Sequence, residues 1–83
     1  MSDDKAQDQV EAGRRVVAFL ADPAIKGAMD TLSGKVIREW TLATTPEARE
    51  AAWHSYNAVL RLEQELRAVV GRGQVAEERL SRP

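Results

Sequence analysis

Few residues in this chain have the types and the spacing that metal binding requires. His54 is the only histidine, and the chain contains no cysteine. A zinc site in a protein draws on several His, Cys or carboxylate ligands at short spacings, and His54 has no such set near it in the sequence. At helical spacing His54 falls beside Glu50 and Arg61, which predicts an exposed side chain. We therefore predict no metal site.

Hydroxyl and carboxyl groups also show no catalytic pattern. Ser33 and Ser55 have no neighbouring base, which a serine nucleophile needs. The carboxylates are scattered along helix faces and chain ends, where solvated surfaces explain them better than acid–base catalysis does. No glycine-rich loop follows a strand, so no phosphate site is indicated. The sequence predicts no catalytic residue, no cofactor-binding residue and no cofactor, and therefore a protein that is not an enzyme.

Aromatic side chains are the residues best suited to recognition. The chain has two Trp, one Tyr and one Phe, and Trp and Tyr are enriched at the energetic centres of protein interfaces. Trp40 and Trp53 have two interpretations, core packing between two helices and an interface anchor, which are compatible if two subunits share a core. Together with Tyr56 and Leu60, these two residues form the interface that we predict.

The longest element that positions these aromatic residues is a helix predicted over 46–70. Its apolar positions recur in alternating steps of four and three, which is the spacing of one helix face. Either Thr45 caps this helix with Pro46 at the first helical position, or Thr44 and Glu47 form a capping box. Gly71 is the expected C-cap in the left-handed conformation. The apolar seam comprises Ala48, Ala52, Ser55, Val59, Leu62, Leu66 and Val69.

Two further helices are predicted before this one, over about 7–20 and about 23–43. Asp22 is a good N-cap, and Pro23 suits the first helical turn. Residues 1–6 are expected to be a flexible leader, and residues 72–83 a tail with a short helix. Because the loop before Pro46 is very short, the helices over 23–43 and 46–70 must form an antiparallel hairpin. The predicted fold class is all-α, in one small domain over 1–83.

Glycines in the second helix have two interpretations. Gly27 and Gly34 fall on the face opposite its apolar arc, and each costs about 1 kcal/mol relative to Ala in a helix. They are either exposed positions without a packing role or points where the backbone of a partner approaches closely.

Composition limits the class of protein. The chain has 83 residues, a formal net charge of −1, 43% hydrophobic and 30% charged residues, which is typical of a globular protein. The chain has no basic patch of the kind that would indicate a nucleic-acid partner. No apolar run reaches the roughly 20 residues that span a bilayer, and the start has no signal-peptide pattern. We expect a soluble intracellular protein without a membrane partner.

Apolar side chains cover more of the 46–70 helix than one neighbour can bury. The seam and the flank formed by Trp53, Tyr56 and Leu60 together sweep roughly 200° of the helix at 100° per residue. We expect the seam to face the second helix and the flank to need the first helix or a second copy. A domain this small buries only roughly 60% of its unfolded surface, so we predict self-association as a dimer or larger ring.

Several boundary and packing residues follow one another in a characteristic order over roughly residues 18–80. They are Leu20, Asp22, Pro23, Trp40, Thr44, Thr45, Pro46, Arg49, Glu50, Trp53, Gly73, Ala76 and Leu80. This order resembles that of small all-helical tailed-bacteriophage proteins whose genes lie among head and packaging genes. The resemblance implies no catalytic residues.

What the resemblance implies is a phage-encoded structural or assembly accessory protein that binds a virion or packaging component through helical contacts. Its expected location is the host cytoplasm or the virion. The alternative is a host-directed phage modulator, which would bind and inhibit a bacterial defence or transcription protein.

Overall fold

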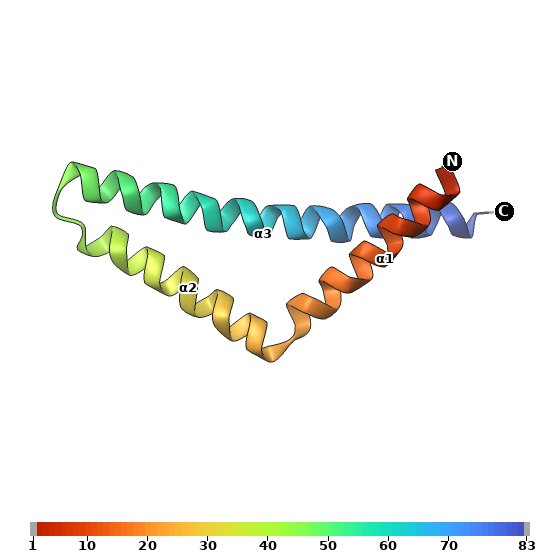
Figure 1. The fold of residues 1–83 in the computed structure, drawn as a ribbon, viewed down its shortest axis with the longest axis horizontal. Coiled ribbons are helices and arrows are strands. Elements are labelled where there is room, and N and C mark those ends of the chain that lie inside the picture. The colour runs from red at the N-terminus through yellow and green to blue at the C-terminus, as the bar shows by residue number, and fades with distance from the viewer. Residues whose placement is uncertain (1, 83) are drawn as a thin grey trace.

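A computed structural model describes residues 2–82, with side chains from residue 3 onward. It contains three helices, α1 (Ser2–Ala21), α2 (Pro23–Leu42) and α3 (Pro46–Ser81), and no strand within the described residues. The all-α prediction is confirmed. Helices α1 and α2 form the two arms of a V, and α3 runs across its open side, so that α1 crosses the C-terminal part of α3 (Figure 1).

Side-chain caps fix where α2 and α3 begin. Asp22 Oδ1 accepts hydrogen bonds from the backbone N–H groups of Ala24, at 2.8 Å, and Ile25, at 3.4 Å. Thr45 Oγ1 accepts from Ala48 N at 3.1 Å, and a proline follows each cap. These bonds satisfy backbone donors that a helix start leaves free. Of the two caps predicted for the third helix, the one at Thr45 forms.

The α2–α3 hairpin is also confirmed. Only three residues separate Leu42 from Pro46, and the two helices leave this connection antiparallel (Figure 1). Val36 of α2 and Ala52 of α3 are buried, at 4% and 3% exposure. The predicted end of the second helix at Ala43 is one residue too late, because Ala43 is the C-cap.

The predicted end of the third helix at Val70 is wrong. The helix continues for 36 residues to Ser81 and includes most of the expected tail. None of the described glycines has a positive φ, so Gly71 does not form a left-handed cap. The continuation is stabilised by tertiary packing, because Gly73 and Ala76 are buried on the side of α3 that meets α1.

The crossing of α1 and α3 brings two backbones close together. A Cβ atom built on Gly73 would lie 2.8 Å from the carbonyl oxygen of Gln9 and 3.1 Å from Gly13 Cα. A Cβ on Gly13 would lie 3.2 Å from Gly73 Cα. A side chain at Gly73 would therefore force the backbones to move apart, and one at Gly13 would be a tight contact that requires a shift of a few tenths of an ångström.

The expected leader is helical from Ser2, which corrects the predicted start at Gln7. Asp3 and Asp4 lie in the first turn, where negative charge complements the helix dipole. Ala6 is only 5% exposed, so this segment packs within the fold. Met1 lies outside the described residues.

Little of the molecule is buried. The molecule measures 59 × 25 × 15 Å, and its Cα radius of gyration is 17.4 Å. A compact domain of this length has a radius of gyration of about 12 Å. Four residues form the buried apolar core of the described part, and all of them are small or β-branched: Ala6, Val36, Ala52 and Ala76.

Candidate functional site

The site that the structure supports best is an aromatic hollow in the α2–α3 hairpin. Its volume is about 370 Å³. Two of its residues come from α2 and three from α3. It is lined by Ile37, Trp40, Trp53, Tyr56 and Asn57.

Helical spacing explains why these residues share one side of the hairpin. Trp53, Tyr56 and Asn57 are spaced i, i+3 and i+4 on α3, and Ile37 and Trp40 are spaced i and i+3 on α2. Residues at these spacings are neighbours on a helix surface. Because the connection is short, these residues of α2 and α3 lie opposite each other, and Trp40 shares the hollow with Trp53 near the start of α3.

About half of the surface of the hollow's apolar side chains faces solvent. Trp40 is 43% exposed, Trp53 48% and Ile37 52%, and Tyr56 is also exposed. The side chains therefore do not form a closed core between the two helices. Below them, the buried contact of the hairpin is made by Val36 and Ala52.

Polar groups at the edge of the hollow hold its shape. Asn57 Nδ2 donates a hydrogen bond to the carbonyl oxygen of Trp53 at 2.9 Å. The ring of His54 meets that of Trp53 edge to face, with 5.2 Å between centroids and 73° between planes. Arg49 Nε donates to the Ala43 carbonyl at 3.5 Å, across the connection. No charged side chain lines the hollow itself.

Three of the four predicted interface residues line this hollow, and one does not. Leu60 is half-buried and lies outside the lining. Leu62, which was predicted to lie in the apolar seam that faces the second helix, is 54% exposed. The spacing of residues on one helix predicts which side chains share a face but not where neighbouring helices pack. In the structure α2 lies along the N-terminal part of α3, and α1 crosses its C-terminal part (Figure 1). Sequence reasoning missed Ile37, although its position three residues before Trp40 was a usable signal.

The rest of the predicted seam is divided between two neighbours. Ala52 is buried, and Val59, Leu66 and Val69 are half-buried. Ala48 and Ser55 are exposed. Val69 lies near the crossing with α1, because its carbonyl oxygen is 3.4 Å from a Cβ built on Gly13. The C-terminal part of the seam therefore packs on α1 and not on α2.

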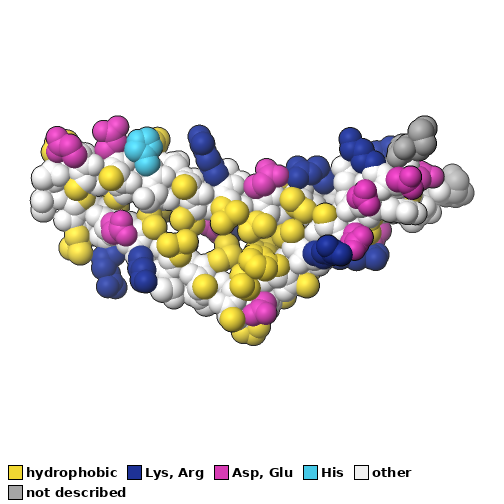
Figure 2. All heavy atoms as spheres, viewed as in Figure 1, with side chains coloured by type: hydrophobic (Ala, Val, Ile, Leu, Met, Phe, Trp, Pro, Cys, Tyr) yellow, Lys and Arg dark blue, Asp and Glu magenta, His cyan; other side chains and the backbone are white. Residues whose placement is uncertain are grey.

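Hydrophobic side chains also gather on the face shown in Figure 2, over the middle of α3 and the joint between α1 and α2, while charged side chains lie mainly toward the two ends. The described residues hold exposed large apolar side chains on all three helices. Outside the hollow these are Val17, Phe19, Leu32, Leu42, Leu62, Val75 and Leu80.

Charged groups form surface pairs without a convergent polar site. Arg14 and Glu77 join α1 to α3 at 2.6 Å, with side-chain exposures of 74% and 57%. His54 Nε2 lies 3.7 Å from Glu50, and its side chain is 66% exposed, as the sequence predicts. No group of three or more His, Cys, Asp or Glu within the described chain has the proximity to hold a metal ion.

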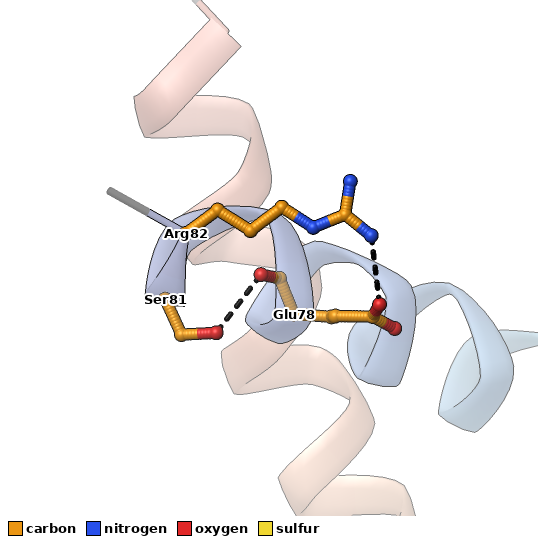
Figure 3. Close-up of polar contacts among 3 residues, drawn as sticks. All are labelled: Glu78, Ser81 and Arg82. Carbon is orange, nitrogen blue, oxygen red and sulfur yellow. Dashed lines mark hydrogen bonds and ion pairs between the residues drawn. The ribbon is translucent and has the colours of Figure 1, made fainter.

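The C-terminal turn of α3 has its own polar contacts. Ser81 Oγ donates to the Glu78 carbonyl at 2.9 Å, and Arg82 Nη2 donates to Glu78 Oε1 at 2.8 Å (Figure 3). Both bonds join neighbouring turns. The Ser81 bond satisfies one of the carbonyl groups that a helix end leaves free, and the Arg82 bond is an ion pair between side chains. They have the geometry of a helix terminus and not of a binding site.

None of the helices over the described residues is long and apolar enough to cross a membrane. The chain matches no protein-family model, no curated protein and no solved structure. The fold and the aromatic hollow are therefore the basis on which a function is argued.

Proposed function

We propose that this protein is a non-enzymatic helical protein that acts by protein–protein contact. The observation that carries the proposal is the accessible surface, which is 6561 Å². A compact monomer of 9.2 kDa exposes about 4,900 Å². The chain thus exposes about 1,600 Å² more than its mass requires, which is about twice the roughly 800 Å² that one partner contributes to a standard protein interface.

The type of surface exposed supports the same proposal. Large apolar side chains are exposed along all three helices, and contiguous apolar patches on proteins mark interaction sites. Both tryptophans lie in one hollow with a tyrosine, and these are the residue types that dominate interface energetics. The hollow is the surface through which the protein would bind.

As its biological role we propose structural or assembly accessory work for a tailed phage. The support is the resemblance in residue order described above, in which Asp22-Pro23 and Thr45-Pro46 mark helix starts. Both pairs do start helices. The partner is then a virion or packaging component, and further copies of the chain contribute to the assembly.

The test is affinity purification of the tagged protein from cells in which a phage that carries this gene is growing, followed by mass spectrometry. Wild-type protein should retain a virion or packaging protein, and a variant with Trp40→Ala and Trp53→Ala should lose it. Leu62→Ala, on the opposite side of α3, is the control and should retain it. Retention of a host defence or transcription protein in its place would support the host-directed alternative, and equal retention by the double variant would contradict the proposed binding surface.

A further inference from the structure

We infer that a second copy of this chain covers the aromatic hollow, so that two α2–α3 hairpins pack face to face as a four-helix bundle. The inference rests on the proposed function, since the dimer formed through the hollow is the form that would bind the virion or packaging component. Its residues are the five that line the hollow.

The isolated chain leaves a larger area exposed than a compact domain of its size. The 6561 Å² of accessible surface is about half of what the unfolded chain exposes, whereas a domain of this size leaves about 40% exposed. Removing the excess of about 1,600 Å² from each of two chains gives about 3,200 Å² of buried surface. Obligate homodimers bury about 2,000–5,000 Å², so a second copy accounts for the excess.

The α2–α3 hairpin by itself buries little between its two helices. Two packed helices bury only the residues along their line of contact, and in this hairpin the buried residues are Val36 and Ala52. A four-helix bundle gives each helix two neighbours and encloses the side chains between the hairpins. Ile37 and Trp40 of α2 lie on the same side of the hairpin as Trp53 of α3, which is the side that a second hairpin would cover.

The lining of the hollow is compatible with a contact between two identical surfaces. In a two-fold interface the same patch meets itself, so any charge at its centre meets a like charge. No charged side chain lines the hollow, and the chain's net charge of −1 gives little overall repulsion between copies. The polar groups of Tyr56 and Asn57 lie in the lining, where each has the hydrogen-bonding capacity to pair across the two-fold axis.

The experiment uses the two tryptophans as reporters, since both lie in the hollow. Wild-type protein at 100 µM or so should have the mass of a dimer by size-exclusion chromatography with light scattering, and its tryptophan emission should be blue-shifted. Dilution should shift the emission to the red as the mass falls. Tyr56→Glu keeps both tryptophans and should weaken the dimer about 30-fold or more.

The matched control is Leu62→Glu. Leu62 is exposed to a similar extent as Trp53, at 54% and 48%, and the step of nine positions from Trp53 to Leu62 places it about 180° around the helix. It should dimerise like wild type. Circular dichroism checks that each variant is helical, and if Tyr56→Glu fails to fold, Ile37→Glu on α2 replaces it.

Three results would overturn the inference. One is a wild-type monomer at these concentrations with red-shifted emission. Another is a dimer that Leu62→Glu dissociates and Tyr56→Glu does not, which would place the contact on the opposite face. The third is a monomer whose emission shifts to the blue only when a virion protein is added, in which case the proposed function stands and the second copy is excluded from the hollow.

Discussion

At the scale of single residues, the glycines of this chain have different surroundings and therefore different roles. Gly13 and Gly73 face each other where α1 crosses α3; a methyl group at Gly73 would lie too close to backbone, and one at Gly13 would be a tight contact. Gly27 and Gly34 have nothing within 4 Å of a built Cβ. In the isolated chain they are therefore exposed positions without a packing role, which is one of the two interpretations given above. One residue type thus marks both the tightest contact of the molecule and open surface.

We predict opposite effects on stability at these two kinds of glycine. Gly73→Ala should lower the free energy of unfolding by about 1–3 kcal/mol, because the methyl group would force the helices apart. Gly34→Ala should raise it by about 0.5–1 kcal/mol, since alanine is the better helix former. Urea unfolding followed by circular dichroism at one protein concentration measures both. A destabilising Gly34→Ala would indicate that this face is covered by a partner backbone.

At the scale of elements, the helix starts depend on single side chains. Asp22 provides the N-cap of α2 and also stands where α1 ends and the chain turns. Its carboxylate accepts from two backbone N–H groups. The start of α2 at the joint between α1 and α2 is thus fixed by an N-cap that can be recognised in the sequence.

Substitution of this cap should cost a predictable amount. Asp22→Ala removes the acceptor and should reduce the free energy of unfolding by about 1 kcal/mol. Asp22→Asn keeps an acceptor oxygen and should stay within a few tenths of a kcal/mol of wild type. Thermal unfolding of the three proteins at equal concentration compares them. Equal losses in both variants would mean that the charge, and not the hydrogen bond, matters at this position.

The C-terminal part of α3 is the element that holds α1. Gly73 and Ala76 are buried, and Arg14 of α1 pairs with Glu77. We predict that truncation after Gly71 leaves the α2–α3 hairpin helical and releases α1. Hydrogen exchange should show loss of protection over 2–21 and little change over 46–60. Unchanged protection of α1 would contradict the role of this crossing.

At the scale of the whole molecule, the extended triangle of helices has too small a core for its surface. The four arginine–carboxylate ion pairs found in the described residues all lie between side chains that are at least 52% exposed, and exposed pairs each contribute about 0–1 kcal/mol. Stability must therefore come from apolar burial, of which the single chain provides less than a compact domain of its size.

This imbalance predicts a melting temperature that depends on protein concentration. If folding is coupled to association, each tenfold increase in concentration should raise the melting temperature, because mass action favours the associated state. Calorimetry between about 5 and 500 µM would show the trend, with Tyr56→Glu as the variant that loses it. A constant melting temperature for the wild type would show that the monomer is stable by itself.

The sequence by itself determined what depends on near neighbours. Helix faces follow from spacings of three and four residues, caps from groups within three residues, and the hairpin from a connection too short for another arrangement. For these reasons the three helices, their starts at Pro23 and Pro46, and three residues of the aromatic hollow were predictable.

Only the tertiary structure decided what depends on residues far apart. Gly73 is equally compatible with a helix end and with a close crossing, and Gly13, sixty residues earlier in the chain, selects the crossing and extends α3 to Ser81. The burial of Leu60 and the exposure of Leu62 likewise follow from where α1 and α2 approach α3. A helical pattern shows which side chains share a face, but the approach of the other helices decides which face is covered.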